Sequence, residues 1–232
     1  MFKIIIWSGH HSREINQLIT ETYSSSDCLL ILCPPRIKNL EAWLPLLPSG
    51  TVEFRGDFEG QRSFTHTSTT IYSELPSFGL FSTGTVDNSK LILYSKKNLE
   101  TSIAGIFSFF TDLKITSIFS YPQPYHIFGL ALGYLTAFIN KWELTYPEGT
   151  YSRDAHREWM QASTENGESL LTLGTPTHFM DAMSFCSDNN LSPAKSLTAI
   201  VGGAKVEKKL WYNLQSELRI AKPSVGYGCS EA

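Results

Sequence analysis

Short apolar runs alternate along the chain with stretches in which apolar residues recur every three or four positions. The continuous runs predict buried strands, and the periodic stretches predict helices with one buried face. The expected strands are Phe2–Trp7, Leu29–Cys33, Leu91–Tyr94, Ile115–Phe119, Leu170–Leu173 and Leu197–Val201. The expected helices follow Ser12 and Pro35 and then cover 98–110, 127–140, 175–189 and 206–218. This alternation predicts an α/β fold of mostly parallel sheets with helices on both faces.

Two segments interrupt the regular alternation. Residues 55–78 are polar and rich in Ser and Thr, which predicts a long loop or an irregular edge hairpin. Residues 140–167 are also polar and are the expected excursion from the regular pattern. We therefore expect a short N-terminal α/β unit over 1–78 and a second, more regular α/β subdomain over 79–232.

Composition narrows the class of protein. Hydrophobic residues make up 42% and charged residues 18%, which is typical of a globular chain. The net charge of −3 argues against nucleic acid or an anionic membrane as a partner. The longest apolar stretch, Ile127–Ile139, is shorter than the roughly 20 residues of a membrane helix. The four cysteines have no C-x-x-C spacing, so we expect a soluble, cytoplasmic protein without a zinc site or disulfide framework.

Three segments carry candidate chemistry. The loop between Phe81 and Lys90 is rich in hydroxyl groups, contains a glycine and ends on a cation, as suits phosphate oxygens; the alternative is a polar turn between strands. Tyr227-Gly-Cys-Ser-Glu231 combines a ring for a purine, a hydroxyl for phosphate and a carboxylate for Mg²⁺; the alternative is an ordinary turn. The Gly202-Gly-Ala204 step ends a strand, where it suits either a flat ligand or a plain strand-to-helix turn.

These segments, in this order, resemble the adenylate-forming enzymes, which include acyl- and aryl-CoA ligases, adenylation domains of peptide synthetases and luciferases. Segment Gln123–Gly129 is similar to the family's Pro-x-x-His-x-x-Gly segment, and Gly174–Thr177 to its Gly-x-Pro-Ser/Thr step. The resemblance covers residue 79 to the end and leaves 1–26 and 55–78 unmatched. The phosphate-loop matches are Ser82, Thr83, Gly84, Thr85 and Lys90, and those of the last signature are Tyr227, Gly228, Ser230 and Glu231.

The resemblance implies the large N-terminal domain of these enzymes and their chemistry: a carboxylic acid reacts with ATP to give an acyl-adenylate, and coenzyme A then takes the acyl group. It implies that the loop residues and Ser230 bind the phosphates of ATP, that Glu231 holds Mg²⁺, and that Tyr227 and Gly228 line the nucleotide. Residues Gly202, Gly203 and Ala204 would floor the pocket, and His126 would be the catalytic residue beside the acid. His126 and the short N-terminal region are similar to o-succinylbenzoate–CoA ligase of menaquinone synthesis.

Two departures leave alternatives open. Asp87 stands where the family loop has glycine, and a carboxylate there would repel a phosphate. The family's lysine-bearing C-terminal domain would follow Glu231, so we expect a truncated chain with little ligase activity of its own. One alternative is a degenerate homologue that binds a nucleotide or a partner without turnover. Another is a serine hydrolase using Ser230, which is disfavoured because such a serine precedes a helix.

The remaining histidines, His10, His11, His66, His156 and His178, lack metal-binding spacing, and we interpret them as surface or structural residues.

Overall fold

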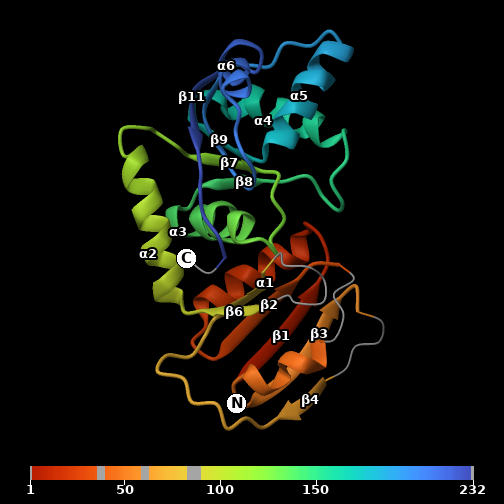
Figure 1. Cartoon of the computed structure of the whole chain (residues 1–232), viewed down its shortest axis with the longest axis vertical. Coiled ribbons are helices and arrows are strands. Elements are labelled where there is room, and N and C mark those ends of the chain that lie inside the picture. Colours follow the sequence, from red (N-terminus) through yellow and green to blue (C-terminus); the bar gives the residue numbers. More distant parts are fainter. Residues whose placement is uncertain (1, 36–39, 59–62, 83–89, 231–232) are drawn as a thin grey trace.

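The computed structural model of this chain describes residues 2–35, 40–58, 63–82 and 90–230. They form two β-sheets separated by a layer of helices, with a further helical layer on the outer side of the second sheet (Figure 1). The first sheet has the strand order β4-β3-β1-β2-β5-β6 and the second has the order β11-β10-β9-β7-β8. The predicted α/β class with mostly parallel sheets is confirmed.

The first sheet is parallel in its middle and antiparallel at both edges. Its four parallel strands are β1 (Lys3–Ser8), β2 (Cys28–Cys33), β3 (Gly50–Gly56) and β5 (Phe78–Phe81). The edge strands are β4 (Ser63–His66), which pairs with β3, and β6 (Leu91–Tyr94), which pairs with β5. The boundary expected between residues 78 and 79 falls inside β5.

Both faces of the first sheet are covered, which explains why its strands are continuously apolar. Ile5 and Trp7 of β1 belong to the core shared with the middle helices. Their neighbours Ile4 and Ile6 face the opposite side, where the 3₁₀-helix η1 (Leu40–Leu46) packs. Successive side chains of a strand point to opposite faces, so a strand covered on both sides shows no polar alternation.

All strands of the second sheet run parallel. They are β7 (Ser117–Ser120), β8 (Glu143–Thr145), β9 (Leu170–Gly174), β10 (Ser196–Val201) and β11 (Ile220–Val225). Because the strands share one direction, their carboxyl ends meet at the same edge of the sheet. This edge therefore gathers segments that are far apart in the sequence.

Helices fill the space between the sheets and cover the outer face of the second one (Figure 1). The middle layer contains α1 (Arg13–Ser24), α2 (Lys96–Phe107), the π-helix η3 (Phe128–Leu135) and its continuation α3 (Thr136–Asn140). The outer layer contains α4 (Ala155–Asn166), α5 (Pro176–Asp188) and α6 (Lys208–Ser216). Two short 3₁₀ turns, η2 (Ser108–Phe110) and η4 (Gly167–Ser169), complete the described helical elements.

The helices begin where side chains satisfy their first backbone N–H groups. Ser12 caps α1 by accepting a hydrogen bond from the Ile15 amide, as the sequence predicts. Thr175 and His178 form a reciprocal capping box at the start of α5. These local signals explain why the predicted helix starts are close to the observed ones.

The two irregular segments contain more structure than the pattern predicts. The edge hairpin expected within 55–78 is present, but its first strand, β3, already begins at Gly50 and carries Glu53 and Arg55 on its more open side. The excursion expected over 140–167 contains β8 and the helix α4. The prediction missed α4 because, apart from Trp159, the buried residues of this helix are small or polar, as at Ala155, His156 and Ala162.

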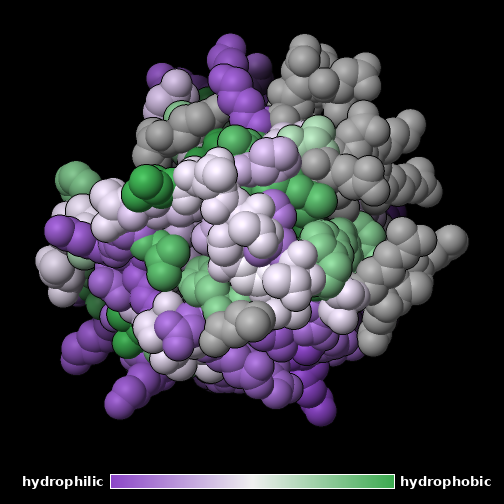
Figure 2. Space-filling model, turned by 90° about the horizontal axis from the view of Figure 1, so that it is seen from below, coloured by the Kyte–Doolittle hydropathy of each residue, from purple (hydrophilic) through white to green (hydrophobic). Residues whose placement is uncertain are grey.

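The end of the molecule beyond the first sheet has a mixed surface. Figure 2 views the protein from this end and shows apolar areas broken up by polar side chains. Leu46 of η1 is 48% exposed and Phe64 of β4 is 38% exposed. Among the described residues, no helix is both long and apolar enough to span a membrane.

Candidate functional site

The carboxyl edge of the second sheet brings several of the expected site residues together. Gly202 directly follows β10, and its amide donates a hydrogen bond of 3.0 Å to the Gly174 carbonyl at the end of β9. Gly226 follows β11, and its amide donates one of 2.9 Å to the Val201 carbonyl. Open α/β sheets bind ligands at this edge, where strand ends and the loops after them converge.

Gly202 stands where a side chain would be crowded by its surroundings. A Cβ atom on this residue would lie 3.2 Å from the Phe128 ring and 3.3 Å from the Gly226 carbonyl oxygen. Phe128 begins the π-helix η3, so the glycine lets the helix, β10 and the segment after β11 approach one another. Gly203 has a φ of +78°, in the left-handed region that favours glycine, and both it and Ala204 are exposed. Gly202 is thus buried at the end of β10, and the backbone of Gly203 and Ala204 lies open after it.

His126 lies in the turn that leads from β7 into η3. Its amide donates to the Gln123 carbonyl at 3.1 Å, and its own carbonyl accepts from the Leu130 amide at 2.9 Å, so the backbone is held on both sides. The ring lies beside Tyr125, with centroids 4.7 Å apart. Partial burial lowers the pKa of His126 below its usual value. The imidazole is therefore neutral near pH 7 and suited to hydrogen bonding.

The ends of the expected phosphate loop are closed by two hydrogen bonds. The Ser82 amide donates to the Lys90 carbonyl at 2.9 Å, and the Lys90 amide donates to the Ser82 hydroxyl at 3.0 Å. Ser82 follows β5 and Lys90 precedes β6, so the loop projects from one hairpin of the first sheet. Thr83, Gly84, Thr85 and Asp87 lie outside the described residues, as does Glu231.

The segment after β11 leaves the second sheet and reaches the first. The Tyr94 hydroxyl, at the end of β6, donates a hydrogen bond to the Ser230 carbonyl. Between these contacts, the Tyr227 side chain is fully exposed and Gly228 is also exposed. Tyr94 lies three residues beyond Leu91, roughly 10 Å along β6 from the loop end of the strand. Ser230 and the Ser82–Lys90 loop are therefore tied to the same edge strand.

Sequence reasoning missed a buried cluster of histidines and tyrosines. His11 is 1% exposed, and its Nδ1 lies 2.8 Å from the Tyr134 hydroxyl. Its Nε2 lies 3.3 Å from the Tyr121 carbonyl, which only accepts, so Nε2 carries the proton and Nδ1 accepts from Tyr134. Burial lowers the pKa of His11 to about 4, in agreement with a neutral ring. The histidine joins the end of β1 to η3 and the end of β7.

His156 has a comparable place under the outer helices. The Tyr151 hydroxyl donates to Asp181 at 2.9 Å, so the His156 Nε2–H must donate to the Tyr151 oxygen at 3.0 Å. Its Nδ1 then accepts from the Tyr121 hydroxyl at 2.9 Å. Burial lowers the pKa of His156 to about 4. The structural interpretation of His11 and His156 is confirmed, but no local pattern indicated that they converge around Tyr121.

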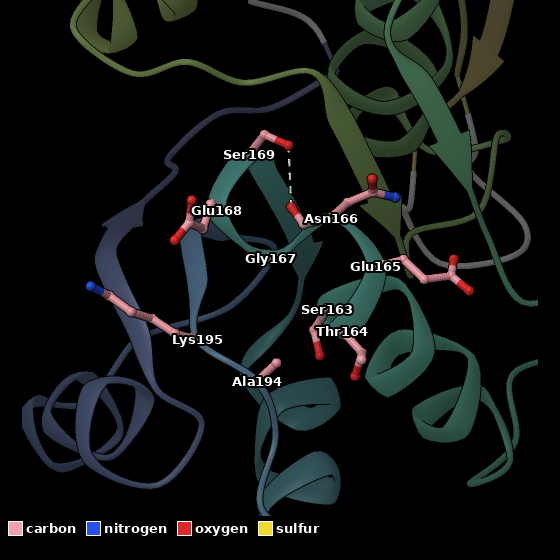
Figure 3. Close-up of a pocket in the computed structure, with 9 residues that line it drawn as sticks. All are labelled: Ser163, Thr164, Glu165, Asn166, Gly167, Glu168, Ser169, Ala194 and Lys195. Carbon is pink, nitrogen blue, oxygen red and sulfur yellow. Dashed lines mark hydrogen bonds between the residues drawn. The ribbon is translucent and has the colours of Figure 1, made fainter.

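A surface hollow of about 470 Å³ lies near the opposite, amino-terminal ends of β9 and β10 (Figure 3). It is lined by Ser163 to Ser169 together with Ala194 and Lys195. The Glu165 and Lys195 side chains point away from each other in Figure 3, and the Ser169 hydroxyl donates to the Asn166 carbonyl. The hollow contains none of the expected site residues. Across the described part of the chain, no group of three or more His, Cys, Asp or Glu residues could hold a metal ion.

Solved structures that align with almost the whole of this chain include adenylate-forming enzymes. A malonyl-CoA ligase with methylmalonyl-CoA and AMP bound aligns with a TM-score of 0.68 and 13% identity over 97% of this chain and 51% of that protein. The adenylation domain of a keto-acid-selecting peptide synthetase, bound to a keto acyl adenylate, aligns with a TM-score of 0.70 and 12% identity over 99% of this chain and 48% of its own. The fold is therefore that of the large N-terminal domain of adenylate-forming enzymes.

Curated proteins with similar sequences are named acyl-CoA ligases. The chain is 27% identical over 155 residues to the acyl-CoA ligase SID4 of Ajellomyces capsulatus, which is 66% of this chain and 25% of that protein. It is 26% identical over 149 residues to the acyl-CoA ligase cnsG of Penicillium expansum, 64% of this chain and 30% of that protein. No protein-family model matches. The aligned part is thus between a quarter and a third of each curated relative and about half of each solved structure.

Proposed function

We propose that this chain is the nucleotide-binding part of an AMP-forming acid–CoA ligase. A carboxylate oxygen of the substrate attacks the α-phosphorus of ATP and pyrophosphate leaves, which gives an acyl-adenylate. The sulfur of coenzyme A then attacks the acyl carbon, and AMP leaves. The observation that carries the proposal is the path of the segment after β11, which runs from Gly202 to Tyr94 of β6, the edge strand that follows the phosphate loop in the chain.

The proposal assigns the phosphates of ATP to the first sheet and the last segment. Ser82, Thr83, Gly84, Thr85 and Lys90 are proposed to surround the β- and γ-phosphates, because backbone N–H groups, hydroxyls and an ammonium suit an anion. Lys90 is exposed, and the hydrogen bonds at the loop ends keep it close to Ser82. Ser230 is proposed to bind the α-phosphate and Glu231 the Mg²⁺ ion.

The nucleoside and the acid are assigned to the carboxyl edge of the second sheet. The exposed ring of Tyr227 is available to stack on adenine, and Gly228 leaves the backbone open beside it. Gly202, Gly203 and Ala204 are proposed to floor the nucleotide and acyl pocket. His126 is proposed to donate a hydrogen bond to the acid, because its lowered pKa keeps the ring neutral. We propose o-succinylbenzoate as the first acid to test, with a place in cytoplasmic menaquinone synthesis.

Binding of ATP·Mg²⁺, measured by calorimetry on the 232-residue chain, tests the proposal. We expect saturable binding that Lys90→Ala weakens about tenfold, since a cation next to phosphate contributes on the order of 1–2 kcal/mol. Lys97→Ala, which removes an exposed lysine from the first turn of α2, is the matched control and should leave the affinity unchanged. Absence of binding, or equal effects of the two substitutions, would contradict the proposal.

A second candidate is a homologue that binds a nucleotide or a partner without turnover. Asp87 favours it, because a carboxylate within the phosphate loop opposes the charge of ATP. Acid-dependent exchange of pyrophosphate into ATP separates the two candidates when measured on the whole protein. Exchange stimulated by a carboxylic acid supports the ligase, whereas ATP binding without exchange supports the second candidate.

A further inference from the structure

We propose that Tyr94 is a positioning residue for the nucleotide site, and that its hydroxyl holds the backbone of Ser230 in place for ATP. The inference rests on the proposed function, because it concerns the segment assigned to the α-phosphate. It adds a residue that lies outside every motif described above. Residues 94 and 230 are 136 positions apart, and the hydrogen bond between them links the two sheets.

The Tyr94 side chain has a rigid support. Its backbone lies opposite Phe78 in the β5–β6 ladder, and the next residue, Ser95, caps α2. The ring is 8% exposed and belongs to the core between the first sheet and the middle helices, together with Leu99 and Ile103. A strand, a helix cap and a packed core therefore fix the direction in which the hydroxyl points.

The segment that receives the hydrogen bond is more open. After the Gly226 contact with the second sheet, Tyr227, Gly228 and Cys229 are exposed, and none of the described residues lies within 4 Å of the Cβ position of Gly228. Glycine also gives the backbone extra freedom here. A hydrogen bond at Ser230 thus restricts a segment whose neighbouring residues have few contacts.

The chemistry separates the two parts of the Tyr94 side chain. An aromatic ring is sufficient to fill the core position, and phenylalanine would do so equally well. The hydroxyl reaches the Ser230 carbonyl and orders the backbone before ATP arrives. A segment that is ordered in advance loses less conformational entropy on binding, so the affinity for the ligand is higher.

The test combines Tyr94→Phe with a reporter on the held segment. Cys229 is exposed, and Cys28→Ser removes the other thiol that is not fully buried, so a nitroxide label can be placed on Cys229. We expect Tyr94→Phe to increase the mobility of the label in the electron spin resonance spectrum. We also expect ATP·Mg²⁺ to bind about three- to tenfold more weakly in calorimetry of the unlabelled chain, the range set by one hydrogen bond.

Two matched variants separate positioning from general stability. Tyr23→Phe removes another tyrosine hydroxyl, which donates to Glu100 and joins α1 to α2. Ile103→Val weakens the core that surrounds the Tyr94 ring without removing a polar group. Both should lower the melting temperature slightly and leave the label mobility and the ATP affinity at the wild-type values.

Each result has one meaning. A mobile label together with weaker ATP binding in Tyr94→Phe alone supports the positioning role. An unchanged label mobility, or an unchanged ATP affinity despite a mobile label, overturns it. If the wild-type chain itself does not bind ATP, the proposed function is wrong, and Tyr94 then has no role in ATP binding. The label mobility still shows whether Tyr94 holds the segment.

Discussion

At the scale of single residues, some positions require glycine because a side chain there would come too close to neighbouring atoms. Gly129, at the start of η3, is the clearest case, because a Cβ atom there would lie 2.2 Å from the Gln123 carbonyl oxygen. The close approach places the helix directly against the turn that carries His126. Gly105 in α2 is the opposite case, because no residue in the described ranges lies within 4 Å of its Cβ position. Of these two helical glycines, Gly129 therefore has no room for a side chain, whereas Gly105 has room for one.

We expect Gly129→Ala to reduce the free energy of unfolding by about 1–3 kcal/mol, because the added methyl group must displace backbone atoms. Gly105→Ala is the matched control and should raise it by about 0.5–1 kcal/mol, since alanine favours the helix and meets no neighbour. Urea unfolding of both variants measures the two changes. Equal signs would show that helix propensity alone governs these positions.

At the scale of elements, helix starts hold their places through local hydrogen bonds. The α2 helix follows β6 without a linker, and its capping box joins Ser95 and Asn98 reciprocally. Because Tyr94 directly precedes this box, the cap also fixes the end of the strand that contacts Ser230. The capped start of α2 therefore restricts the motion of the end of β6.

Ser95→Ala should lower the free energy of unfolding by about 1 kcal/mol, because the first turn of α2 loses the acceptor for the Asn98 amide. For a chain of this length the melting temperature should fall by about 2–4 °C. Ser108→Ala, at the other end of the same helix, removes an exposed hydroxyl that donates to the Gly105 carbonyl. This substitution should lower the melting temperature less. A calorimetric scan distinguishes the two, and a larger loss for Ser108→Ala would contradict this account.

At the scale of the whole molecule, neutral histidines help to join parts of the fold that are distant in sequence. His11 lies between the end of β1, η3 and the end of β7, and His156 lies between Tyr121 and the Tyr151–Asp181 pair. Their pKa values are about 4 in the folded chain, against 6.5 in the unfolded chain. Between pH 6.5 and about pH 4 the unfolded chain binds more protons than the folded chain, so the folded state loses stability as the pH falls.

We expect the free energy of unfolding to be constant above about pH 7 and to fall by about 2 kcal/mol for each of these histidines on going to pH 5. His156→Gln should unfold more easily at pH 7 but show a shallower loss toward pH 5. Gln161→Ala, an exposed change on the same helix α4, serves as the control and should keep the wild-type slope. Urea titrations at pH 5 to 8 measure the slopes, and equal slopes for His156→Gln and wild type would exclude a titrating role.

The sequence by itself determined the α/β class, the apolar strands and the capped starts of the helices after Ser12 and Thr175, because these depend on neighbours within a few residues. It also predicted which residues follow the strand ends, such as Gly202 after β10. Only the tertiary structure decided that Ser230 meets Tyr94 and that His11 and His156 both contact Tyr121. The physical reason is that these contacts join residues 35 to 136 positions apart through the packing of sheets and helices, and residue spacing carries no signal for that packing.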